Sequence, residues 1–259
     1  MRFPQQNVKG MVMKILFSPS ETKTNKAFLP AINEKSFIFR HLYEKRMEVI
    51  GRYQDIIQKQ DIASLSTLFG IKDAQKCLAL SHINPFSALT CKAIERYDGV
   101  AYDYLHYPTL LESAQNFIDH HVLIFSNLFG PLLAGENIPE YKLSQGETLE
   151  GFKPELFYKE AFSPSLDAML EDEFIVDLRA GFYEKFYTIK KPFVTAKFLK
   201  NGKVVSHFAK AYRGKMLRQL SISQPQNEEA FQKINFEHLK IVEILKTKFK
   251  SEYVFDIVD

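Results

Sequence analysis

The stretch MKILFSPSETK, residues 13–23, decides the fold because a short apolar run passes directly into a polar loop. Residues 13–18 predict a buried strand. Pro19 blocks its continuation, and the serine, glutamate and threonine that follow favour a loop. Because ligand-binding loops of mixed sheets commonly follow the carboxyl ends of strands, Ser18 and Lys23 are candidates to hold an anion. The alternative interpretation is a simple polar turn.

Other apolar runs and turn signals predict the remaining elements. Buried strands are predicted at 122–126, 174–178 and 253–258. Asn201-Gly202 supplies the positive φ angles of a tight turn and predicts a hairpin between 193–199 and 204–208. Apolar periodicity, capping residues or an initial proline predict helices at 33–60, 62–69, 74–81, 108–119, 163–170, 210–220 and 236–249. A turn is predicted at 97–105 and a loop-rich segment at 127–150.

Composition bounds the class of fold. The chain of 259 residues is 46% hydrophobic, which is enough to bury one core. Interspersed helices and strands predict a mixed α/β (α+β) fold, a single compact domain over 13–259 with a mixed sheet and packed helices. A small helical subdomain is expected near 33–92. Residues 1–12 are expected to be disordered or a non-native start, because the first strand begins at Met13.

Several functional classes are disfavoured by the sequence. Cys77 and Cys91 are too few for a disulfide framework and match no zinc motif, and the 7 histidines form no helical metal-ligand pair. No apolar run reaches the ~18 residues of a membrane span, and the N-terminus lacks the apolar region of a signal peptide. We therefore expect a cytoplasmic protein with no membrane partner, no metal and no cofactor, and we expect a monomer.

Positive charge is concentrated in one segment. The net charge is +3, yet the segment from Arg179 to Arg218 holds eleven Lys and Arg residues against Glu184 alone. This excess indicates either an anionic partner or a lysine-rich solvated face. In residues 207–220, HFAKAYRGKMLRQL, an arginine offers a planar fork for phosphate, and a glycine permits close approach of a ligand or another backbone. The candidate phosphate-binding residues here are Lys197, Lys210, Arg213, Gly214, Lys215 and Arg218.

Residues 68–74, LFGIKDA, carry the pattern L-x-G-I-x-x-A. In a helix-hairpin-helix, such a glycine turn leaves the first amides of the second helix free to bind a phosphate oxygen. Gly70, Ile71 and Lys72 are then candidate phosphate contacts. Against this, Lys72 stands where the usual motif has a second glycine, and Asp73 adds a negative charge. The alternative is a structural helix–turn–helix in which the glycine only ends a helix.

These stretches, in their order along the chain, resemble the YaaA peroxide-stress protein family from Met13 to about Leu220. The segments that carry the resemblance are KILFSPSETKT, LFGIKDA, YDGVAYDYL, SNLFGPLLAGENIPEYKL, FIVDLRAGFYEKFY and FAKAYRGKML. The resemblance implies a cytoplasmic bacterial protein that limits oxidative damage and is associated with lower free intracellular iron. It also implies a mixed α/β body with a helix-hairpin-helix, a positively charged cleft and DNA binding.

The resemblance extends to individual positions. The matching residues are Ser18, Pro19, Lys23, Leu68, Gly70, Ile71, Ala74, Tyr97, Gly99, Tyr102, Leu105, Lys210, Arg213 and Gly214. The chain departs from the commoner family form in its first loop, where Ser20-Glu21 precede Thr22-Lys23.

Two functions from different classes follow. The first is a peroxide-stress protein that protects DNA and proteins by sequence-independent binding of duplex or distorted DNA, and that lowers free iron indirectly. The second is an enzyme that binds a small phosphorylated or nucleotide ligand in the basic cleft, with Glu21 or Asp98 as candidate general acid or base. Direct iron storage is disfavoured because the histidines and carboxylates form no ligand cluster in the sequence.

Overall fold

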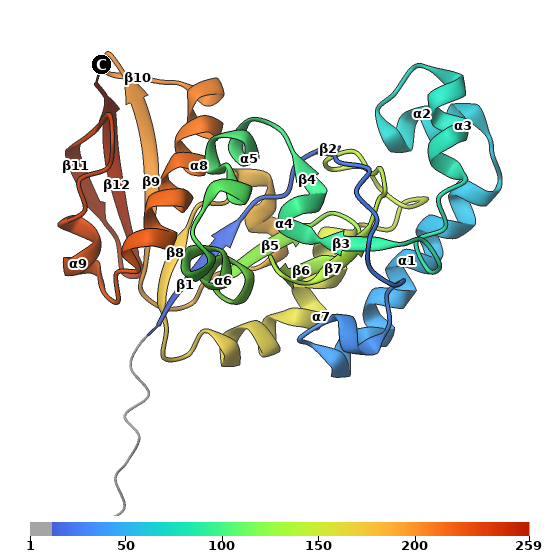
Figure 1. The fold of residues 1–259 in the computed structure, drawn as a ribbon, viewed down its shortest axis with the longest axis horizontal. Coiled ribbons are helices and arrows are strands. Elements are labelled where there is room, and N and C mark those ends of the chain that lie inside the picture. The colour runs from blue at the N-terminus through green and yellow to red at the C-terminus, as the bar shows by residue number, and fades with distance from the viewer. Residues whose placement is uncertain (1–11, 259) are drawn as a thin grey trace, which may run out of the picture.

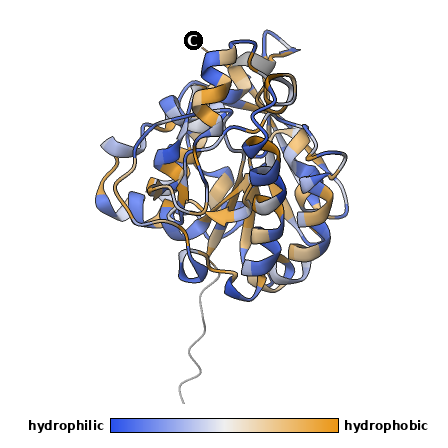
Figure 2. Cartoon of the chain, turned by 90° about the vertical axis from the view of Figure 1, so that its right-hand side faces the viewer, coloured by the Kyte–Doolittle hydropathy of each residue, from blue (hydrophilic) through white to orange (hydrophobic). Residues whose placement is uncertain are grey.

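The protein is described from a computed structural model, which covers residues 12–258; of Ser206 and His207 only the backbone is described. The expected disordered or non-native start, residues 1–12, lies outside this range except for Val12. No helix within the range is long and apolar enough to cross a membrane. Apolar residues gather in the central strands and on the inner sides of the helices (Figure 2).

Within residues 12–258, the core is an eight-stranded mixed sheet of strand order β11-β12-β9-β8-β1-β5-β6, in which β10 also pairs with β9 (Figure 1). Adjacent strands from β12 to β5 are parallel, and β6, β10 and β11 pair antiparallel with their neighbours. The strands are β1 (Met13–Phe17), β5 (Val122–Ser126), β6 (Gly130–Leu133), β8 (Phe174–Asp177), β9 (Phe193–Lys200), β10 (Lys203–Val204), β11 (Leu239–Lys246) and β12 (Lys250–Ile257).

Short strands and helices cover and extend this sheet. β2 (Thr22–Lys23) pairs with β4 (Tyr97–Asp98), and β3 (Thr90–Lys92) pairs with β7 (Asn137–Pro139). The α-helices are α1 (Tyr43–Gln58), α2 (Ile62–Phe69), α3 (Ala74–Ser81), α4 (Ala93–Arg96), α5 (Val100–Leu105), α6 (Glu112–His121), α7 (Pro154–Met169), α8 (Ser206–Ser223) and α9 (Glu228–Gln232). The 3-10 helices are η1 (Glu34–Ser36), η2 (Arg40–Leu42), η3 (Tyr107–Thr109) and η4 (Gly181–Phe186).

The chain leaves β1 and its neighbour β8 in opposite directions across the sheet. From β1 the chain continues to β5 on one side, whereas β8, the neighbour on the other side, continues to β9 and away from β1. The loops that follow β1 and β8 therefore part at the carboxyl edge of the sheet. In open sheets of this kind, such a switch point leaves a crevice where ligands bind.

The predicted fold class is confirmed, and several elements match their predicted ranges. The strands at β1, β5, β8 and β12 and the helices α2 and α3 lie where the sequence placed them. The predicted hairpin turn is also present, because Asn201 and Gly202 have φ angles of 53° and 72°. The helix-hairpin-helix subdomain is not confirmed.

Other predicted ranges were wrong because tertiary packing decided them. Helix 33–60 begins only at Tyr43, since Phe37 and Phe39 are buried in the core and the segment before α1 forms η1 and η2. The predicted helix 236–249 is the edge strand β11, whose Ile and Val residues suit a sheet and pair with β12. The predicted strand 204–208 ends at Val204, because α8 begins at Ser206.

Four further segments also differ from their predictions. The turn predicted at 97–105 is β4 followed by α5, and the loop-rich segment 127–150 contains β6 and β7, paired with β5 and β3. The helix predicted at 163–170 begins earlier, at Pro154, where a proline suits the first turn. The helix predicted at 108–119 is displaced to Glu112–His121.

A glycine lies in the contact between helices α5 and α8. A Cβ atom at Gly214 would lie 2.0 Å from the carbonyl oxygen of Ala101, so only glycine permits this approach of the two helices. Gly51, in the middle of α1, has no atom within 4 Å of the same position. Alanine should therefore change the stability of the protein in opposite directions at these two positions.

We expect Gly214→Ala to lower the free energy of unfolding by about 1–3 kcal/mol, because the new methyl group pushes α5 and α8 apart. Gly51→Ala should raise it by up to about 1 kcal/mol through helix propensity alone. Urea unfolding of the two variants checks both signs. Equal effects of the two substitutions would contradict the packing described here.

Candidate functional site

A cavity of about 280 Å³ lies at the carboxyl ends of β1 and β8, and we call it the switch-point cavity. Its walls come from the segments that diverge there and from two helices that cover them. The lining residues are 17–22, 99–102, Gln145, Leu178, Ala180, Tyr183, Lys210 and Arg213. The structure therefore brings together Ser18, Glu21, Lys210 and Arg213 from the residues predicted by sequence.

Ser18 joins three walls of the switch-point cavity. Its Oγ accepts a hydrogen bond of 2.8 Å from the backbone N–H of Ala180, which follows β8. Its carbonyl oxygen accepts a hydrogen bond of 2.9 Å from the Tyr102 hydroxyl of α5. Because the Ser18 hydroxyl accepts in the first bond, its own proton remains able to donate to a ligand.

Arg213 is a cation that lines the cavity and has no direct partner among residues 12–258. Its helix is fixed against α5 by Gly214, which explains why a glycine stands beside it. Burial lowers the pKa of Arg213, while the carboxylates of Asp177 and Glu184 act in the opposite direction. No hydrogen bond or ion pair joins its guanidinium to any other residue of the described chain. Lys210, one turn earlier in α8, is exposed and lines the same cavity.

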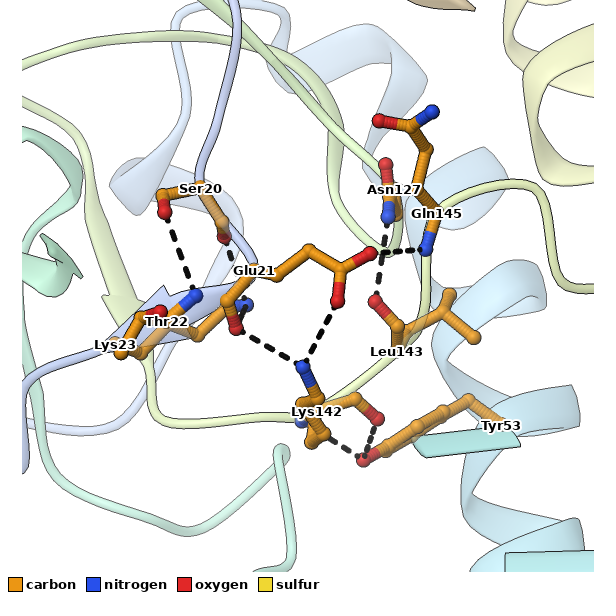
Figure 3. A network of polar contacts seen from close by, with 9 residues as sticks. All are labelled: Ser20, Glu21, Thr22, Lys23, Tyr53, Asn127, Lys142, Leu143 and Gln145. Atoms are coloured by element: carbon orange, nitrogen blue, oxygen red, sulfur yellow. Dashed lines mark hydrogen bonds and ion pairs between the residues drawn. The ribbon is translucent and has the colours of Figure 1, made fainter. Parts of the chain in front are cut away.

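Glu21 is held in place by two donors (Figure 3). Its carboxylate accepts hydrogen bonds from Lys142 Nζ at 3.2 Å and from the backbone N–H of Gln145 at 2.9 Å. Partial burial raises the pKa of Glu21, but these donors outweigh burial and lower it overall. A carboxylate held ionised in this way fits a structural contact, which ties the loop after β1 to Lys142 and Gln145, better than a general base.

Lys23 lies behind the cavity wall. Its Nζ donates to the carbonyl oxygens of Ser20 at 3.2 Å and Glu21 at 3.4 Å, and stands 4.1 Å from the centre of the Tyr141 ring. Burial, and then the nearby charge of Lys142, lower its pKa to about 7. Lys23 therefore changes charge near neutral pH, which an exposed lysine does not.

Asp98, the other candidate acid or base, does not line the switch-point cavity. Its Oδ1 accepts a hydrogen bond of 2.9 Å from the N–H of Gly99, and its backbone pairs with Thr22 between β2 and β4. These contacts fix the start of α5, whose first residues line the cavity.

The hairpin between α2 and α3 lies at the far end of the molecule from α5 and α8 (Figure 1). Gly70 ends α2 with a φ of 64°, and its N–H donates to Thr67 O at 3.2 Å. The N–H of Ile71 donates to Ser66 O, also at 3.2 Å. These two amides are used within the hairpin, whereas the prediction concerned the first amides of the second helix, α3. Phosphate contact at Gly70 and Ile71 therefore stays a prediction. Lys72 is exposed, and its contact with DNA stays a prediction.

Several cations of the segment 179–218 make contacts within the fold. Arg179 pairs with Asp177 at 2.8 Å, and Lys191 donates to backbone carbonyls after α7. Arg218 donates to the carbonyl oxygens of Leu105 and His106 at the end of α5. These three charges are therefore used within the fold, and a basic surface for an anionic partner stays a prediction.

Lys215 and Lys197 also lie outside the cavity. The Lys215 ammonium stands 5.5 Å from the centre of the Tyr104 ring. On β9, Phe198 packs against Tyr212 of α8, so its neighbour Lys197 points to the opposite face of the sheet. Gly214 serves the second of its two predicted roles, the close approach of another backbone.

A protein-family model described as peroxide stress protein YaaA matches residues 13–245. The chain belongs to this family. It is 46% identical over 247 residues to an uncharacterized protein of Campylobacter jejuni, a match that covers 95% of this chain and 100% of the relative. It is 34% identical over 226 residues to a UPF0246 protein of Corynebacterium efficiens, covering 82% of this chain and 86% of the relative. A UPF0246 protein of Streptomyces coelicolor is 26% identical over 215 residues, covering 80% and 82%.

For this member of the YaaA family, sequence reasoning did not name three cavity residues, Gln145, Ala180 and Tyr183, as site residues. Tyr183 and Ala180 follow β8, so the rule of strand carboxyl ends that pointed to Ser18 could have found them. Lys142 and Gln145 have no residue pattern that marks them as site residues, and only the folded contact with Glu21 identifies them.

We expect the half-buried Lys23 to make stability rise with pH. Its folded pKa of about 7 lies below the ordinary lysine value of 10.5, so the unfolded chain holds more protons between these values. The free energy of unfolding should therefore increase from about pH 7 toward pH 10.5, and Lys23→Met should remove this part of the slope. Urea titrations across that range measure it, with Lys26→Met as the control that keeps the slope. An unchanged slope in Lys23→Met would contradict the assignment.

Proposed function

We propose that this member of the YaaA peroxide stress protein family binds a phosphate-bearing ligand, a small phosphorylated metabolite or nucleotide, in the switch-point cavity. The observation that carries the proposal is the Arg213 guanidinium, which faces the cavity and has no hydrogen-bond partner within the described chain. A planar guanidinium matches two phosphate oxygens at once, and Lys210 adds a second positive charge at the rim.

The size of the cavity supports one phosphate-bearing unit. Its volume of about 280 Å³ lies just below the usual range of small-molecule pockets, about 300–1,000 Å³. A duplex cannot enter a cavity of this size. The Ser18, Ser20 and Thr22 side chains at the rim are hydroxyl donors for further phosphate oxygens.

A second candidate function is sequence-independent binding of distorted DNA, and the exposure of Lys210 favours it. An open rim with an exposed cation would admit a nucleotide that is still joined to a strand, if that nucleotide has left the base stack. Bulged or damaged DNA provides such nucleotides at low cost. Binding of this kind, by a monomer in the cytoplasm, would protect DNA during peroxide stress, and any lowering of free iron would be indirect.

A thiol mechanism finds little support in this chain. Cys77 and Cys91 are both buried, and burial raises the pKa of each thiol. Peroxide reduction by cysteine requires an accessible thiolate of lowered pKa. The proposed role in peroxide stress therefore rests on the anion site rather than on direct reaction of these cysteines with peroxide.

We expect Arg213→Gln to weaken binding of a fluorescent nucleoside monophosphate about 10- to 100-fold, because a charge-assisted hydrogen-bond pair is lost. Lys215→Gln, on the same helix but outside the cavity, is the matched control and should change affinity less than about twofold. Fluorescence anisotropy at fixed salt measures both.

The same variants separate the two sources of phosphate. If bulged duplex DNA binds tightly, the mononucleotide does not bind, and Arg213→Gln weakens the DNA complex, the ligand is DNA. A shallow salt dependence would then indicate few phosphate contacts, since the slope is about −0.9 per neutralised phosphate. Wild-type affinity of Arg213→Gln for both probes would overturn the proposed site.

A further inference from the structure

Two lysines converge on one backbone carbonyl at the edge of the switch-point cavity (Figure 3). Lys142 Nζ donates to the carbonyl oxygen of Glu21 at 3.2 Å, and Lys23 Nζ donates to the same oxygen at 3.4 Å. Lys23 Nζ also donates to Ser20 O at 3.2 Å. Because Ser20 and Glu21 line the cavity, both ammonium groups lie directly behind its wall.

The surroundings of Lys23 act in opposite directions on the protonation of its amine. Burial disfavours the charged ammonium, and the positive charges of Lys142 and Arg96 oppose it further. Glu21 and Glu140 favour the charged form, and the faces of Tyr97 and Tyr141 lie within 5.4 Å and 4.1 Å of the nitrogen. These opposing contributions leave the pKa of Lys23 at about 7. A small change in nearby charge therefore changes how often Lys23 holds its proton.

We infer that Lys23 is a positioning residue that couples proton uptake to the binding of an anion in the switch-point cavity. The inference rests on the proposed function, because it requires an anion at that site. An anion against Ser20 and Thr22 adds negative charge on the other side of the wall from the Lys23 ammonium. Charges this close and partly shielded from water interact strongly, so the anion stabilises the protonated amine.

The sign of the effect follows from the pKa of Lys23 in the empty protein, about 7. Below that pH the amine is already protonated, and an anion binds without proton uptake. Above it, binding must be accompanied by uptake of a proton, so affinity falls as the pH rises. The fall approaches tenfold per pH unit, the limit for one coupled proton.

A merely structural role for Lys23 makes a different prediction. A neutral amine retains N–H donors, so a lysine that only ties the loop would keep the wall in place at either protonation state. Binding would then be independent of pH, although removal of the side chain would still weaken it. The pH profile of Lys23→Arg separates the two roles, because arginine keeps both donors and charge throughout the range.

The experiment uses inorganic sulfate, whose charge does not change between about pH 6 and pH 9, so that any pH dependence belongs to the protein. Isothermal titration calorimetry of wild type should show affinity that is constant below about pH 7 and falls above it. Lys23→Arg should bind with equal affinity across the range. Lys26→Met, three residues along the same segment and outside the cavity, should follow the wild type.

A second measurement needs no variant and guards against a misfolded Lys23→Arg. Titration of wild type at about pH 8 in two buffers of different ionisation enthalpy gives the number of protons taken up, which should approach about one per sulfate. No uptake, or the wild-type pH profile in folded Lys23→Arg, overturns the inference and leaves the proposed site standing. Absence of sulfate binding at every pH overturns both.

Discussion

The contact between Gly214 of α8 and the carbonyl oxygen of Ala101 in α5 determines where the proposed anion site can form. A side chain at Gly214 would meet that oxygen at 2.0 Å, so the two helices lie as close as backbones allow. The preceding residue, Arg213, is thereby placed over the carboxyl edge of the sheet, and the start of α5 closes the opposite side. Without this approach, the loops after β1 and β8 would have no cover and no facing arginine.

Other cations of the segment 179–218 differ from Arg213 because they make contacts within the fold. A sequence segment of net charge +10 suggests an extended surface for a polyanion. In the fold, Arg179 pairs with Asp177 and Arg218 bonds the end of α5, so these charges are neutralised or bound to carbonyls. The cations that line the switch-point cavity are Lys210 and Arg213, where we propose that one phosphate group binds.

The sequence predicted those parts of the fold that local chemistry determines. Buried strands such as 13–17 and 122–126 could be located because parallel strands covered on both faces are almost continuously apolar. Residue type and position also singled out Ser18 and Arg213, and the structure places both on one cavity. Their contact with a ligand stays a prediction. Strand β11 could not be located in this way, because its apolar spacing also fits a helix and only pairing with β12 decides the matter.

Roles that depend on residues far away along the chain could not be predicted from the sequence. Glu21 has the residue type of an acid or base. Its contacts with Lys142 and Gln145, more than a hundred residues away, show that it ties two segments together. Gly70 has the spacing of a phosphate-binding hairpin, yet its N–H is used within the turn. Lys23 carries an ordinary side chain whose unusual pKa comes from burial and from neighbours brought by folding.

The most direct measurement of the central claim is the NMR signal of the Arg213 side-chain Nε–H during titration with a nucleoside monophosphate. Arg218, which is bonded to the carbonyls of Leu105 and His106, provides an internal reference in the same spectrum. The account predicts that the Arg213 signal shifts progressively and saturates while the Arg218 signal stays in place. Saturable binding of the nucleotide without any change at Arg213 would contradict it.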